Sequence, residues 1–71
     1  MDVSTLAEAL FVSRLRPADC PETPEVRAAI ADSLQSLGAG GCLAAMAQEF
    51  GDYPDTAPAR MRWALGLVRS L

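Results

Sequence analysis

Residues 23–51 read TPEVRAAIADSLQSLGAGGCLAAMAQEFG, and two helical patterns separated by a run of glycines can be recognised in them. Thr23, Pro24 and Glu25 form a helix start signal, because a hydroxyl can cap the first turn, proline needs no backbone hydrogen bond there, and an acid is favoured by the helix dipole. We predict a helix from Pro24 to Leu37. Its core-facing stripe, at helical spacing, consists of Val26, Ala29, Ile30, Ser33, Leu34 and Leu37.

The glycines of the segment 38–41 predict the end of that helix and a sharp reversal, since glycine tolerates the left-handed backbone that closes a helix. We expect a short third helix, of about nine residues, to follow at once and to stop at Gly51. Its apolar side chains recur at helical spacing and are Leu43, Met46, Ala47 and Phe50.

Toward the N-terminus, Thr5 and Glu8 have the spacing of a capping box, in which each side chain accepts a hydrogen bond from a free backbone N–H. A first helix is predicted to begin there. It must end by Arg16, because Pro17 disfavours helical geometry in the residue before it. Its buried face is expected to hold Leu6, Leu10 and either Phe11 or Leu15.

Toward the C-terminus, a last helix is predicted to begin between Asp52 and Ala57, with Asp52 or Thr56 as its cap, because Pro58 fits only near a first turn. Its predicted core stripe consists of Met61, Ala64, Leu65, Val68 and Leu71. Beside this stripe, Trp63 and Leu67 define a second apolar edge.

The chain of 71 residues, 51% of them hydrophobic, has the length and composition of one globular domain. Short connections and the lack of any strand pattern predict an all-α fold over residues 1–71, a small bundle or an orthogonal array of about four helices. Neither a secretory signal nor a run of ~18 apolar residues is apparent, so we expect a cytoplasmic protein with no membrane partner.

The sequence also lacks the residues that most enzymes use. It has no histidine, the commonest general base and metal ligand. Its two cysteines, Cys20 and Cys42, have no partner set for zinc and no Cys-x-x-Cys motif, and no phosphate-binding loop is present. We therefore expect no enzyme, no catalytic residue, no cofactor and no metal, with Cys42 behaving as an apolar core side chain.

Residues 47–64 carry the most informative pattern. The match rests on Ala47, Gly51, Thr56, Arg60 and Arg62, with Phe50 and Met61 as core positions. In this order they resemble the helix-turn-helix of bacterial sigma-factor C-terminal domains. The resemblance implies close helix approach at Ala47, a turn at Gly51, and phosphate contacts from Arg60 and Arg62.

This chain departs from the helix-turn-helix pattern where bases are read. Asp52 replaces an apolar turn residue, Pro58 and Ala59 stand where base-reading side chains are expected, and Asp55 places an anion near the groove. All nine acids of the chain lie in residues 1–55, whereas the last helix carries three arginines and no acid. We expect DNA contact to be weak and to need a dimer.

A broader resemblance covers most of the chain. It rests on the segments Leu10-Phe11-Val12-Ser13, Asp19 to Pro24, Val26-Arg27-Ala28-Ala29-Ile30, and Gly41-Cys42 through Met61-Arg62-Trp63-Ala64. In these segments the chain resembles a group of short actinobacterial helical proteins. That resemblance implies a helical architecture and a cytoplasmic compartment, and it transfers no catalytic or binding residue to these positions.

Two functions are consistent with the sequence. The first is a regulatory or adaptor-like interaction domain that presents Trp63, Leu67, Arg60 and Arg62 to a protein partner or to its own copy, because a tryptophan beside arginines is typical of binding hot spots. The alternative is a degenerate helix-turn-helix protein that contacts DNA as a dimer. Its contact residues would be Tyr53, Thr56, Ala59, Arg60 and Arg62. A third reading leaves Trp63 as part of the monomer's own core.

Overall fold

The first helix, α1 (Val3–Phe11), begins two residues earlier than predicted. In the computed structural model, which describes residues 2–71, the Asp2 carboxylate accepts a hydrogen bond from the Thr5 backbone N–H at 2.9 Å. That hydrogen bond holds the pKa of Asp2 below its usual range. The predicted capping box at Thr5 and Glu8 is wrong, because an upstream carboxylate occupies the cap position.

A 3-10 turn, η1 (Pro17–Asp19), connects α1 to the second helix, α2 (Thr23–Asp52). The cap position of α2 is Glu22, one residue before the predicted Thr23. The Glu22 backbone N–H donates a hydrogen bond to the carboxylate of Glu25 at 3.1 Å, which satisfies one free donor of the helix start. The start signal predicted around Pro24 is therefore displaced by a single residue.

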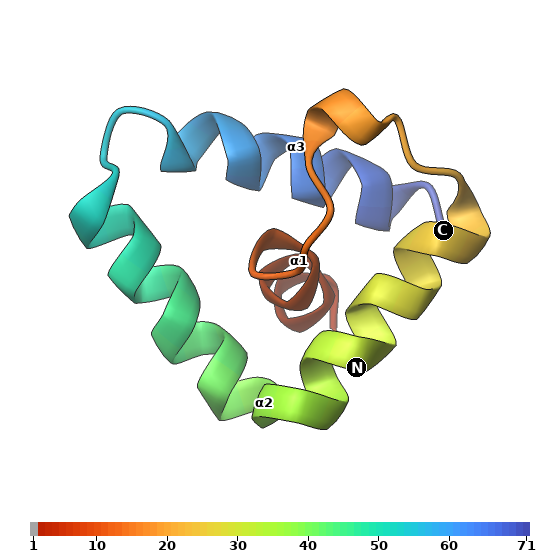
Figure 1. Cartoon of the computed structure of the whole chain (residues 1–71), viewed down its shortest axis with the longest axis horizontal. Helices are drawn as coiled ribbons and strands as arrows, with labels where there is room; N and C mark the ends of the chain where they lie inside the picture. The colour runs from red at the N-terminus through yellow and green to blue at the C-terminus, as the bar shows by residue number, and fades with distance from the viewer. Residues whose placement is uncertain (1) are drawn as a thin grey trace.

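Gly38 is the one residue inside α2 with non-helical torsions, at φ 70° and ψ 169°. Helical geometry resumes directly after it, so two arms, residues 23–37 and 39–52, form a V that Figure 1 shows from the side. The break at Gly38 was predicted. The predicted turn over residues 38–41 is shorter than expected, because only Gly38 leaves the helical conformation. Over residues 2–71 the chain thus has three α-helices and one 3-10 turn instead of four separate helices.

The last helix, α3 (Ala57–Arg69), has Thr56 at its cap position. Thr56 was one of the two caps predicted for this helix. The Thr56 side chain makes no capping hydrogen bond, because its backbone already has helical torsions. Asp52, the other predicted cap, is wrong, since it is the last residue of α2. Pro58 lies in the first turn of α3, where its missing N–H is tolerated.

The hydrophobic helix α1 runs through the middle of the molecule. Figure 1 shows α1 nearly end-on, with the V of α2 around one side and α3 across the other. Accordingly α1 packs against both other helices, while α2 and α3 touch each other much less. The radius of gyration of 10.9 Å matches the roughly 11 Å of a compact domain of this length. The all-α prediction is confirmed.

The core follows the predicted stripes close to α1 and departs from them at the tip of the V. Its buried hydrophobic members are Ala7, Ala9, Leu10, Phe11, Leu15, Val26, Ala29, Ile30, Cys42, Ala57, Ala64 and Val68. Leu37, which directly precedes Gly38, is 48% exposed although it was predicted to be buried. Leu43 is 49% exposed, because the second arm turns Cys42, Met46 and Phe50 toward the core instead. Leu71, also predicted as core, is 38% exposed at the end of the chain.

Candidate functional site

A hollow of about 480 Å³, here called the apolar groove, opens between α1, the first arm of α2 and the end of the chain. It is lined by Leu6, Arg27, Ile30, Ala31, Leu34 and Leu71. Arg27 is the one charged residue among them, so the groove offers a mostly hydrocarbon surface. Val3, which is 42% exposed, lies one turn before Leu6 on α1.

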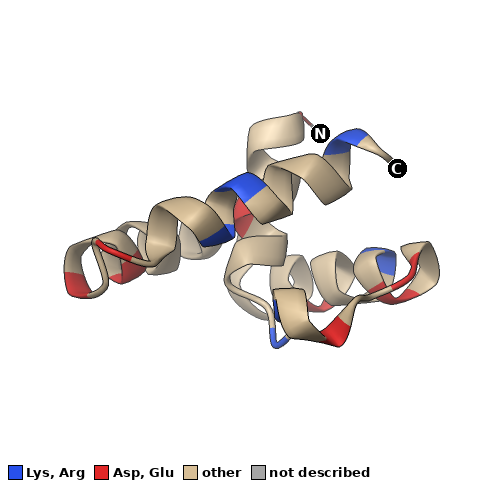
Figure 2. Cartoon of the chain, turned by 90° about the horizontal axis from the view of Figure 1, so that it is seen from above, with Lys and Arg blue, Asp and Glu red and all other residues tan. Residues whose placement is uncertain are grey.

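The two chain ends lie at the same end of the molecule. Figure 2 shows the N- and C-termini there, on the side opposite the acidic segments where α2 passes into α3. Leu71, the last residue, thereby reaches the first arm of α2 and forms part of the groove. The groove thus joins apolar side chains from both ends of the sequence, which no local pattern could have indicated.

Trp63 and Leu67, the predicted apolar edge of the last helix, are both half-buried and pack against the core. Leu71 follows Leu67 at the same four-residue spacing, just beyond the end of α3. The stripe predicted for partner binding therefore becomes more exposed toward the C-terminus, where it reaches the apolar groove. The part of the Trp63 side chain that is buried packs against the monomer's own core, as the third interpretation of the sequence expects.

Arg60 and Arg62, predicted to act together, lie in different environments. The Arg60 Nη2 atom donates hydrogen bonds to the backbone carbonyls of Ser13 at 3.1 Å and Leu15 at 3.3 Å. Its guanidinium also lies over the Phe11 ring, 5.2 Å from the ring centroid. Arg62 is exposed. Residues two apart on a helix do not share a face, so these arginines do not form one surface.

The residues predicted to contact DNA surround the connection between α2 and α3. Tyr53 is 57% exposed, and Thr56 and Ala59 are exposed as well. Two local features differ from those that the helix-turn-helix resemblance implies. Ala47 is exposed and covered by no neighbouring helix, and Gly51 lies within α2 rather than in the turn.

A second hollow, of about 310 Å³, lies on another side of the molecule and is here called the charged cleft. It brings together Arg16 from the loop after α1, Arg60 from α3, and Glu49 and Asp52 from the last turns of α2. Burial and the neighbouring Arg16 guanidinium lower the pKa of Arg60. Sequence reasoning missed this grouping, because Arg16 and Arg60 are far apart in the chain and belong to no common motif.

Both cysteines are unpaired, with Cys20 exposed and Cys42 buried. The Cys42 Sγ atom lies 3.7 Å from the Ser33 carbonyl oxygen across the kink. Burial, and secondarily the charge of Glu8, raise the pKa of the Cys42 thiol. The prediction that Cys42 is an apolar core side chain is confirmed.

Within residues 2–71, no three acidic or cysteine side chains gather closely enough to hold a metal ion. None of the helices in that part of the chain is long and apolar enough to cross a membrane. Comparison of the chain with protein-family models, curated proteins and solved structures gives no match. What the chain binds is therefore inferred from its own surfaces.

Proposed function

We propose that this chain is a non-enzymatic, adaptor-like protein-interaction domain. It binds another protein through the apolar groove, and that protein is a second copy of the same chain. The observation that carries the proposal is the groove, in which five of the six lining residues are apolar. Concave and mostly apolar hollows are typical binding sites, whereas single exposed apolar residues need no explanation.

The size of the chain favours covering the groove. A domain of 71 residues buries only about 60% of the surface that its unfolded chain exposes, so its stability margin is small. Each Å² of apolar surface removed from water contributes about 25 cal/mol. A partner placed over Leu34, Leu71 and the neighbouring Val3 would therefore stabilise the domain as well as bind it.

Self-pairing suits the position of the groove. In a twofold-symmetric dimer the same patch of both copies meets, so a mostly apolar patch on one copy covers the mostly apolar patch on the other. The net charge of −3 opposes association of two copies, and Glu22, Glu25 and Asp32 belong to the start and first arm of α2, which lines the groove. The acids at the junction of α2 and α3 lie away from the chain ends (Figure 2), so pairing through the groove keeps those acids apart.

The test is the molecular mass in solution, measured by sedimentation equilibrium from ~10 to ~300 µM. We expect a dimer that Leu71→Glu converts to a folded monomer, because Leu71 is exposed in the single chain and a carboxylate buried in the dimer without a partner is costly. Leu43→Glu is the matched control, since Leu43 is exposed at the kink and outside the groove. A wild-type monomer at every concentration would contradict the proposal, as would a dimer that only Leu43→Glu dissociates.

DNA binding has weaker support. The Arg60 Nη2 atom donates hydrogen bonds to the Ser13 and Leu15 carbonyls, so Arg62 and Arg69 are the exposed cations of α3. Two such contacts are fewer than the six or more that give useful affinity at physiological salt. The protein-interaction proposal is therefore preferred.

A further inference from the structure

Arg16 and Arg60 converge on the same two carbonyl groups. The Arg16 Nη1 atom donates to Ser13 O at 3.0 Å and to Leu15 O at 3.1 Å. The Arg60 Nη2 atom donates to those same oxygens at 3.1 and 3.3 Å. Each guanidinium has five N–H donors, so both retain donors for another acceptor. Two positive charges are thus held side by side at the charged cleft.

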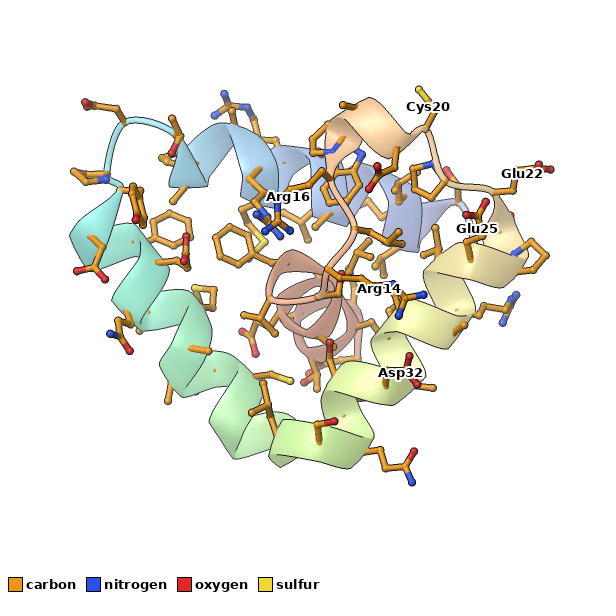
Figure 3. The ribbon with its side chains drawn as sticks, in the orientation of Figure 1. Arg14, Arg16, Cys20, Glu22, Glu25 and Asp32 are labelled. Atoms are coloured by element: carbon orange, nitrogen blue, oxygen red, sulfur yellow. The ribbon has the colours of Figure 1, made fainter. Side chains whose placement is uncertain are left out.

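No carboxylate within residues 2–71 pairs with either of these guanidinium groups. In that range the one ion pair joins Arg14 to Asp32, at 3.4 Å and in an exposed position. Figure 3 shows that Arg14 and Arg16 leave the loop in opposite directions, Arg14 toward the first arm of α2 and Arg16 toward the second. The Nε atom of Arg60 is buried and has no hydrogen-bond partner. The cleft therefore holds unused N–H donors on two guanidinium groups that form no ion pair with a carboxylate in that part of the chain.

The cleft also contains negative charge. Glu49 and Asp52 reach it from the last turns of α2, where the carbonyl end of the helix carries partial negative charge. Gln48 offers a neutral amide, and Phe11 offers an apolar surface. A purely anionic ligand would be repelled by the two carboxylates, and a purely cationic one by the two arginines.

We propose that the charged cleft binds a small zwitterion of the α-amino acid class, with its carboxylate on Arg16 and Arg60 and its ammonium group on Glu49 and Asp52. Arginine is the side chain best suited to bidentate carboxylate recognition. The volume of about 310 Å³ is at the small end of the range of ligand pockets, which suits a molecule of this size. This site uses none of the residues of the apolar groove.

The test is ligand-observed saturation-transfer NMR on the full chain with pools of the common L-α-amino acids. A bound amino acid is then titrated by calorimetry and compared with its N-acetyl and amide derivatives, which lack the ammonium and the carboxylate respectively. We expect both derivatives to bind at least about tenfold more weakly, because each loses one charge-assisted interaction. Binding of the N-acetyl form as tightly as the parent would overturn the zwitterion assignment, and so would the lack of any bound amino acid.

Arg16→Gln is the diagnostic variant, and Arg14→Gln is its matched control on the opposite side of the same loop. Arg16→Gln should fold, since Arg60 continues to hold both loop carbonyls. We expect Arg16→Gln to weaken binding about tenfold and Arg14→Gln to leave it unchanged. Glu49→Gln, which removes negative charge without touching the loop, should also weaken binding. Equal effects of the Arg14 and Arg16 variants would overturn the proposal.

Discussion

The ring of Phe11 contacts both the guanidinium of Arg60 and the ring of Phe50. The Cζ atom of Arg60 is 5.2 Å from the centroid of the Phe11 ring, and the centroids of the Phe11 and Phe50 rings are 5.6 Å apart in a stacked arrangement. Since these three residues belong to α1, α2 and α3, one aromatic side chain ties all three helices together. The arginine predicted to meet a partner is therefore also part of the fold.

Arg60→Met should lower the free energy of unfolding by about 1–2 kcal/mol, because it removes two hydrogen bonds to carbonyls and a cation–π contact. Arg62→Met, at an exposed position, should change it by less than about 0.5 kcal/mol. Urea unfolding followed by the fluorescence of Trp63, the single tryptophan, measures both. Equal stability of the two variants would show that Arg60 does not hold the loop.

Gly38→Ala should destabilise the protein by about 1–3 kcal/mol, because φ 70° with ψ 169° lies in a region that is essentially confined to glycine. Gly40→Ala should instead stabilise it by about 0.4–1 kcal/mol. Gly40 is helical, and a Cβ added there meets nothing within 4 Å. Thermal unfolding monitored by circular dichroism distinguishes the two, and a destabilised Gly40→Ala variant would argue against a continuous second arm.

In the folded protein iodoacetamide should modify Cys20 and spare Cys42. Cys20 is exposed, whereas Cys42 is buried and its thiol pKa is raised, so at any given pH less of the reactive thiolate forms. Intact-mass spectrometry should show one added group under native conditions and two in denaturant. In a Cys20→Ser variant, rapid native labelling would contradict the buried position of Cys42.

A fluorescence-anisotropy titration with duplex DNA should give no appreciable binding at ~200 mM salt and little at ~50 mM. The reason is that Arg60 is engaged inside the protein and the acids Asp52 and Asp55 are exposed close to the expected contact residues. Strong binding that falls steeply with salt, and that Arg62→Ala weakens, would instead favour the helix-turn-helix hypothesis.

Local signals in the sequence predicted the helices well. Pro24 and Pro58 mark first turns, Gly38 marks the break, and the stripe from Val26 to Ser33 is buried as its period requires. Periodicity failed at Leu37, which directly precedes the kink, and at Leu43, because the second arm turns Cys42, Met46 and Phe50 toward the core instead. At the start of α1 two residues suited to capping compete, Asp2 and Thr5, and the hydrogen bond from the Thr5 N–H to the Asp2 carboxylate makes Asp2 the cap.

The candidate sites depended on contacts that sequence spacing does not encode. The edge of Trp63 and Leu67 was predicted from helical spacing, but its continuation into a groove required Leu71 to reach the first arm of α2. The pairing of Arg16 with Arg60 required the loop after α1 to fold back over α3. Both juxtapositions arise from the central position of α1, which brings the outer elements within reach of one another.

The most direct test of binding through the apolar groove is an isotope-filtered NOE experiment on an equimolar mixture of ¹³C-labelled and unlabelled protein, which detects contacts between two copies. We expect intermolecular NOEs at the methyl groups of Leu6, Leu34 and Leu71, which line the groove. The absence of intermolecular NOEs at high concentration, or their restriction to Leu37 and Leu43 at the kink, would contradict binding through the groove.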